Sequence, residues 1–141
     1  MRFMVIVKAN EQSERGVLPE DEAAMAAMGK FNEELVKAGV MLAGEGLHPS
    51  AKGVRINFGA GGKRTVVDGP FSETKELVAG FWLLQTKTRE ECIEWIKRAP
   101  FEPGATLEIR QVHEAEDFAV SDPTGELRAQ EKRLRETLSS R

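Results

Sequence analysis

The segment of residues 68–76 carries a carboxylate followed closely by a cluster of acids and a lysine. Asp68 ends a predicted strand and directly precedes a Gly-Pro turn, so its carboxylate could act as a base or a metal ligand at the mouth of a cavity. The alternative is that Asp68 binds the backbone amides of its own turn, as aspartate commonly does. Lys75 and Glu76, together with Glu45, could form the polar rim of a pocket, or they are surface charges.

A second pair of charged residues lies near the end of the predicted sheet. Glu108 and Arg110 are two positions apart in a predicted strand, so they share one of its faces. They could bind a small carboxylate or carbonyl compound, or form a cross-strand ion pair at an interface. Trp82 is predicted to face the same region, where it could contact a ligand or fill an interface.

Other kinds of site find little support. His48 and His113 do not stand in a metal-ligand spacing, so no metal is predicted, and no cofactor motif is present. The single cysteine, Cys92, lies among apolar residues of a predicted helix, which favours a packed core thiol over a nucleophile. The glycines of residues 59–62 join two strands, which favours a hairpin turn over a phosphate-binding loop.

Length and composition predict one globular domain. The chain has 141 residues, of which 40% are hydrophobic and 30% are charged. Its net charge of −3, spread along the chain, argues against nucleic-acid binding. Because no run approaches the roughly 20 apolar residues that span a bilayer, no membrane association is expected, and the composition favours a cytoplasmic protein.

The periodicity of apolar residues predicts six strands and two long helices. The strands are expected over residues 3–9, 40–43, 54–58, 64–67, 78–86 and 107–112. The first helix is expected to open at Pro19-Glu20-Asp21-Glu22 and to end at Gly39. The second is expected to run from a capping box at Thr88 and Glu91 to Pro100. With one β-hairpin set aside as an insertion, the order is βαββαβ. This order indicates an α+β, ferredoxin-like antiparallel sheet with both helices on one face.

Two of these strands are apolar on both sides, although the helices cover only one. Met4 and Ile6, with Trp82 and Leu84, are predicted to lie on the uncovered face. We therefore expect a homodimer whose sheets pack face to face and enclose a cavity. Residues 1–115 are predicted to form this domain.

Residues 116–141 are predicted to form a charged helical extension. Its helix is expected to start at Asp122 and Pro123, and an apolar stripe follows at Leu127, Leu134 and Leu138. The helix either docks on the domain or its dimer mate, or binds a different partner.

The chain resembles the DGPF-motif family, a branch of the YCII-related proteins in the dimeric α+β barrel group. The resemblance rests on several short segments: Gly44-Glu45-Gly46-Leu47, Asp68-Gly69-Pro70-Phe71 with Glu73, Lys75 and Glu76, Gly80-Phe81-Trp82, and Glu108-Ile109-Arg110. It implies a dimeric barrel. Most members of the family have no assigned activity, and some are associated with extracytoplasmic-function sigma factors. The histidine–aspartate pair proposed for the YCII branch would fall near Asp21 and Ala99, so that pair is missing here.

Three functional hypotheses follow. The first is a homodimer that binds a small molecule and either only binds it or also performs acid–base chemistry; its candidate catalytic residues are Asp68, Glu76 and Glu108, and its candidate ligand-binding residues are Glu45, Lys75, Trp82 and Arg110. The second is a non-catalytic regulator or adaptor linked to an extracytoplasmic-function sigma factor. In the third, the DGPF segment is a folding motif that shapes its turn and seals the dimer.

Overall fold

The computed structural model describes residues 1–16, 21–72 and 76–141 of the chain. The strands are β1 (Arg2–Lys8), β2 (Met41–Gly46), β3 (Val54–Phe58), β4 (Arg64–Asp68), β5 (Val78–Gln85) and β6 (Leu107–Gln111). The α-helices are α1 (Glu11–Glu14), α2 (Glu22–Lys37), α3 (Arg89–Lys97) and α4 (Glu126–Ser139). The chain divides into two compact units, Met1–Gln111 and Val112–Arg141. The predicted boundary between residues 115 and 116 stays a prediction.

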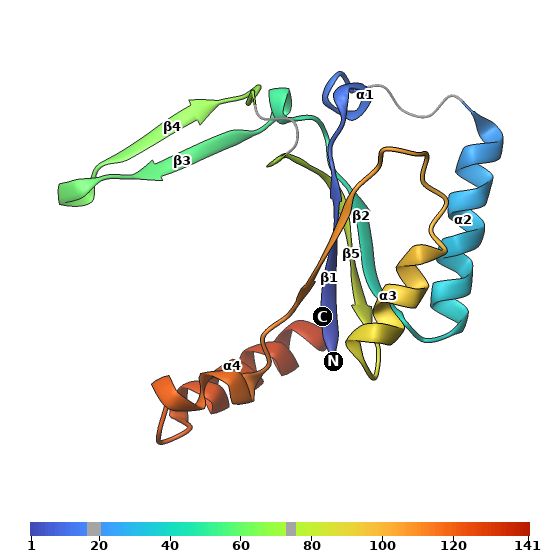
Figure 1. The fold of residues 1–141 in the computed structure, drawn as a ribbon. Helices are drawn as coiled ribbons and strands as arrows, with labels where there is room; N and C mark the ends of the chain where they lie inside the picture. The colour runs from blue at the N-terminus through green and yellow to red at the C-terminus, as the bar shows by residue number, and fades with distance from the viewer. Residues whose placement is uncertain (17–20, 73–75) are drawn as a thin grey trace. The chain divides into compact units, whose positions relative to one another are not determined.

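The first unit is built on a four-stranded sheet in the order β2-β5-β1-β6, with every neighbouring pair antiparallel. Helices α2 and α3 lie on one face of this sheet (Figure 1). Strands β3 and β4, which lie between β2 and β5 in the sequence, form a separate two-stranded hairpin outside this sheet. The predicted fold class, a ferredoxin-like α+β sheet with a hairpin insertion and helices on one face, is confirmed.

The hydrophobic core lies between the helices and the sheet. Phe3 and Val5 of β1 are buried there with Leu84 of β5, and α2 contributes Leu35. Cys92 of α3 is fully buried in the same cluster, and burial raises the pKa of its thiol, with a smaller contribution from the charge of nearby Glu91. The prediction of a packed core thiol is confirmed.

Trp82 lies in this core, on the face opposite to the one predicted. The register of β1 and β5 sets Val5 opposite Trp82, which places the indole beneath the helices. Its ring packs edge-on against Phe31 at 5.8 Å between centroids, and its Nε1 donates a hydrogen bond of 2.9 Å to Oδ1 of Asn32. A Cβ at Gly44 would come within 2.8 Å of the indole, so β2 needs glycine there. The prediction of Trp82 on the uncovered face is wrong, and Leu84 shares the correction because it lies opposite Phe3.

The helix starts follow local capping chemistry. Asp21 caps α2 by accepting the backbone amide of Ala23 at 2.9 Å, whereas the predicted start at Pro19 lies outside the described residues. In α3, Thr88 Oγ1 accepts the amide of Glu91 at 3.1 Å, as predicted. The Glu91 carboxylate accepts the amide of Lys87 at 3.0 Å, which is one residue further back than the capping box requires.

The second unit holds the 3-10 helix Ala115–Ser121 and the helix α4. Helix α4 begins at Glu126, so the predicted start at Pro123 is wrong. The carboxylate of Asp122 accepts the amides of Leu127 and Arg128 at 3.2 and 3.0 Å, and Gly125 turns the chain with a positive φ of 78°. Asp122 therefore caps the helix from four residues before it begins.

The surface of α4 shows the pattern expected from the sequence. The predicted pair of Glu131 and Arg135 forms an ion pair of 2.7 Å. Leu127, Leu134 and Leu138 are all exposed, so the apolar stripe lies open. Of the helices in the described parts of the chain, none has the length and apolar character needed to cross a membrane.

We expect the start of α4 to depend on pH through Asp122. The Arg128 amide, and then that of Leu127, hold the pKa of this carboxyl below its ordinary value. Its contribution to the free energy of unfolding is therefore complete above the ordinary pKa of about 3.9 and is lost as pH falls through the lower folded value. Amide chemical shifts of Leu127 and Arg128, followed from pH 6 to pH 2, check this.

The control is Asp122→Asn, which keeps an acceptor but cannot titrate. In this variant the two amide shifts should lose the transition seen below pH 4 in the wild type. The same transition in both proteins would contradict the assignment to Asp122.

Candidate functional site

The face of the sheet away from α2 and α3 carries a row of four side chains, one from each strand. The strand registers set Glu45 opposite Phe81, Phe81 opposite Ile6, and Ile6 opposite Glu108. Two apolar residues on the central strands are thus flanked by a carboxylate on each edge strand. Neighbouring strands lie about 4.8 Å apart, so the two carboxylates start from backbone positions about 14 Å from each other.

A second row continues the pattern next to the first. It places Ala43 beside Leu83, Leu83 beside Met4, and Met4 beside Arg110. Met4 is 36% exposed, although it lies on a central strand. We call the eight residues of these two rows the open face, because α2 and α3 of the same unit pack on the opposite side of the sheet (Figure 1).

Glu108 is the centre of a charged group on this face. Its carboxylate lies 3.3 Å from the Arg110 guanidinium and 3.6 Å from Nζ of Lys8. The hydrogen bond from Arg110 lowers the pKa of Glu108, and the charge of Lys8 lowers it further, so the group is ionised at neutral pH. Two cations around one carboxylate leave a net positive charge, to which an anionic group could bind. The register gives Glu108 and Arg110 the face expected from their spacing, while their roles stay predictions.

Asp68 lies away from this face, at the end of the hairpin strand β4. Two amides of its turn have other acceptors: Gly69 donates to the carbonyl of Gly53 at 2.9 Å, and Phe71 donates to Oγ of Ser50 at 3.0 Å. The hypothesis that Asp68 binds the turn amides is therefore wrong for these two. Its side chain is exposed, and among the described residues its carboxylate has no hydrogen-bond or ion-pair partner.

Two residues that the sequence did not single out hold the DGPF turn in place. Oγ of Ser50 donates a hydrogen bond of 2.6 Å to the Glu14 carboxylate, while the Ser50 amide donates to the same carboxylate at 3.2 Å. Because Ser50 also accepts the amide of Phe71, one serine joins three segments far apart in sequence. Nothing in the spacing of Glu14 and Ser50 signals this contact.

Gly69 and Phe71 explain why the turn needs its residue types. A Cβ on Gly69 would lie 1.7 Å from the carbonyl oxygen of Ser50, so only glycine fits. The guanidinium of Arg55, from β3, stacks 3.8 Å above the ring of Phe71. The DGPF segment therefore fastens the base of the β3–β4 hairpin to the loop around Ser50, which agrees with the folding-motif hypothesis.

The predicted acids do not meet within one chain. Glu76 is exposed just before Leu77, whose carbonyl accepts the amide of Ala9 at 2.9 Å, and Lys75 lies outside the described residues. Within the parts of the chain that the structure describes, no three His, Cys, Asp or Glu side chains gather closely enough to hold a metal ion. Asp68, Glu76 and Glu108 therefore do not form a metal-binding group within the described residues.

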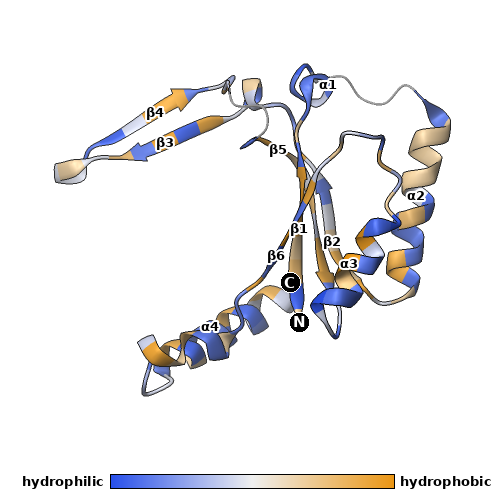
Figure 2. Cartoon of the chain, in the orientation of Figure 1, coloured by the Kyte–Doolittle hydropathy of each residue, from blue (hydrophilic) through white to orange (hydrophobic). Residues whose placement is uncertain are grey.

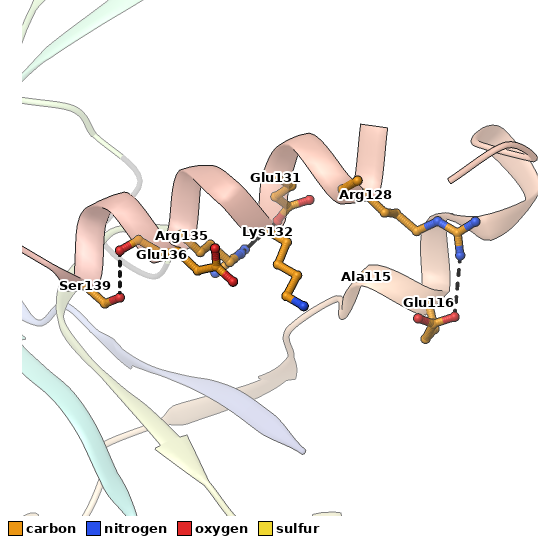
Figure 3. A pocket seen from close by; sticks show the side chains of 9 residues that line it. Ala115, Glu116, Arg128, Glu131, Lys132, Arg135, Glu136 and Ser139 are labelled. Atoms are coloured by element: carbon orange, nitrogen blue, oxygen red, sulfur yellow. Dashed lines mark hydrogen bonds and ion pairs between the residues drawn. The ribbon is translucent and has the colours of Figure 1, made fainter. Parts of the chain in front are cut away.

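A groove in the C-terminal unit was not anticipated from the sequence (Figure 3). Arg128 lies 3.5 Å from Glu116, and Arg135 pairs with Glu131 at 2.7 Å. Lys132 and Glu136 also line the groove, so its lining holds three positive and three negative side chains and has no net charge to attract a ligand.

We expect Gly69→Ala to loosen the hairpin. The added methyl group collides with the Ser50 carbonyl, and overpacking of this kind costs roughly 1–3 kcal/mol. Hydrogen exchange should show faster exchange of the amides of residues 54–68, while β1 and β5 keep their protection.

Gly29→Ala is the matched control, because a Cβ there meets nothing within 4 Å on α2. That variant should raise the free energy of unfolding by about 0.5–1 kcal/mol. Equal exchange of the hairpin amides in Gly69→Ala and in the wild type would contradict the fastening role.

Comparison with known proteins gives one family and several individual matches, of which two follow. The model of the YCII-related domain matches residues 1–116. An uncharacterized protein of Rhizobium meliloti (strain 1021) is 31% identical over 78 residues, which are 55% of this chain and 62% of that relative's length. A solved structure, the 5-chloro-2-hydroxyhydroquinone dehydrochlorinase of Burkholderia phenoliruptrix AC1100 in complex with 2,5-dihydroxybenzoquinone, shares 16% identity over 82% of this chain and 98% of its own, with a TM-score of 0.42.

The structural match is too distant to say anything of this chain's chemistry. The family match is different, because it runs from β1 past the end of β6 and so includes the whole sheet, both of its helices and the hairpin. The chain belongs to the YCII-related domain family.

Proposed function

We propose that the protein is a homodimer that binds a small molecule in a cavity between the open faces of its two copies. The observation that carries this proposal is the arrangement of the open face, with apolar residues on the central strands and, on the edge strands, three charged residues beside Ala43. If this face were simply exposed to water, it would be the polar side of the sheet, opposite the apolar side under the helices.

A second copy is the partner that supplies the missing cover. Two sheets that pack face to face lie about 10 Å apart, which lets the apolar centres of both open faces share one interior. Burying the charged edge residues away from water would be costly unless each had a partner. They therefore favour a space beside the apolar contact that holds water or a ligand. That space is the cavity of the proposal.

The charges suggest the class of ligand. Lys8 and Arg110 together outweigh Glu108, so the group favours an anionic or strongly polar oxygen. The neighbouring Ile6 and Phe81 favour a flat apolar body. The ligand class is therefore a small carboxylate or carbonyl compound with an apolar ring, and the guanidinium of Arg110 is suited to its carboxylate or carbonyl oxygen.

Glu108 is the carboxylate best placed for acid–base chemistry. In the free protein its lowered pKa makes it a weak base. A bound anion would draw Arg110 away and add negative charge, and both effects raise the pKa of Glu108 and make it a better base. Glu45 borders the same face from β2, whereas Asp68 and Glu76 would act only if the second copy brings them close.

The alternative, a regulator linked to a sigma factor, finds no support in the comparisons with known proteins. The cytoplasmic location rests on composition alone and stays a prediction.

We expect Arg110→Met to weaken the binding of benzoate, an aromatic acid of the proposed class, by about tenfold, because it removes a charge-assisted hydrogen bond. Arg89→Met, on the exposed surface of α3, removes the same charge away from the open face and should leave the affinity unchanged. Ligand-observed NMR titration measures both.

Two results would contradict the proposal. Equal loss of affinity in both variants would mean that only net charge matters. Absence of binding to the wild type at millimolar benzoate and related aromatic acids would remove the ligand class.

A further inference from the structure

The hairpin of residues 54–68, formed by β3 and β4 and called the arm below, has one apolar face. The strand register sets Val54 opposite Asp68, Ile56 opposite Val66, and Phe58 opposite Arg64, so these six side chains share one face. The other face carries Arg55, Asn57, Thr65 and Val67. Apolar segments are present on both strands of the arm (Figure 2).

The apolar face of the arm is largely exposed in the described chain, although the Arg64 guanidinium lies 4.4 Å from the centre of the Phe58 ring within it. Val54, Ile56, Phe58 and Val66 are 56%, 53%, 75% and 63% exposed, and every residue of β3 and β4 is exposed. An isolated two-stranded hairpin is marginally stable in water and needs a further surface to pack on. Four large apolar side chains on one side of such a hairpin indicate where that surface lies.

Hydrogen bonds hold the base of the arm, whereas the two strands of the arm are exposed along their whole length. The amide of Gly69 bonds to Gly53, and Ser50 accepts the amide of Phe71 while Glu14 holds Ser50. The arm leaves the sheet on the side away from α2 and α3, which is the side of the open face (Figure 1). Both unpartnered apolar surfaces of the first unit therefore border the same space.

We propose that the arm packs its apolar face on a second copy of this chain and so forms part of the dimer interface. The inference rests on the homodimer of the proposed function. Each strand of the arm has 5 residues and so spans about 17 Å, which exceeds the gap of about 10 Å between two facing sheets. An arm that starts beside one sheet must therefore pass alongside the body of the other copy, and one partner covers both apolar surfaces.

This arrangement gives Asp68 a place in the site. Asp68 lies on the apolar face of the arm, beside Val54 at its base. If that face of the arm packs on a second copy, the carboxylate lies at the edge of the contact, beside Val54.

The test compares two acidic substitutions on opposite faces of the arm, Ile56→Asp and Asn57→Asp. Neither residue packs in the core, so both variants should fold. We expect Ile56→Asp to raise the dimer dissociation constant by at least about tenfold in sedimentation velocity, because it places a charge in the apolar contact. Asn57→Asp should leave it within about twofold. Equal dissociation constants for the two variants would overturn the proposal.

A cross-linking experiment identifies what covers the arm. Ile56→Cys is coupled to benzophenone maleimide, while Cys92 stays buried, and the protein is mixed with an isotope-labelled copy before irradiation. Mass spectrometry should find links from the arm to peptides of the body, residues 1–111, in the other copy. Links to residues 112–141, links only within one chain, or links only between the two arms would overturn the proposal.

Leu83→Asp separates the two proposals. If this open-face variant dissociates the dimer while Ile56→Asp does not, the sheet interface stands and the arm contact is wrong. If the wild type is a monomer, both fail. If Ile56→Asp dissociates the dimer and Leu83→Asp does not, the arm contact stands and the sheet-to-sheet cavity is wrong.

Discussion

A sheet with apolar side chains on both faces and helices on only one is the constraint on which the rest of this structure depends. The helix side is complete, because Trp82, Phe3 and Leu84 are buried there and the indole nitrogen has a partner in Asn32. The other side carries apolar residues on its two central strands, and neither α2 nor α3 packs on it. Burial of apolar surface contributes about 25 cal/mol per Å², so leaving this face in water forgoes a substantial gain.

The DGPF segment links this constraint to the site. Gly69 packs tightly against the Ser50 carbonyl, and the amide of Phe71 donates a hydrogen bond to Oγ of Ser50. Both contacts fix the base of the arm. Its acid, Asp68, is turned toward the apolar side of the arm and makes no described contact in its own chain. The same few residues can therefore serve folding and function, because the turn that holds the arm also sets the position of the carboxylate.

The element order could be predicted from the sequence, and so could much of the open face. Alternation along a strand shows which residues share a side, and this placed Glu108 and Arg110 correctly opposite the helix side. Alternation does not show how neighbouring strands are aligned. The error at Trp82 arose there, because a shift of one residue in the register moves every side chain of β5 to the other face.

Contacts between distant segments were beyond the reach of the sequence. Glu14 and Ser50 are 36 positions apart, and no local pattern marks either of them as a partner of the DGPF turn. The start of α4 was misplaced for a related reason. Pro123 suits a first helical turn, but Asp122 reaches past it to the amides of Leu127 and Arg128, so the helix begins later.

Native mass spectrometry of the freshly purified protein tests the central claim most directly, since it reads subunit number and retained mass together. We predict a dimer, and a retained mass of a small organic acid on part of the population would identify the ligand class. A monomer at all concentrations would contradict the account, because the open face and the arm would then have no second copy to cover them.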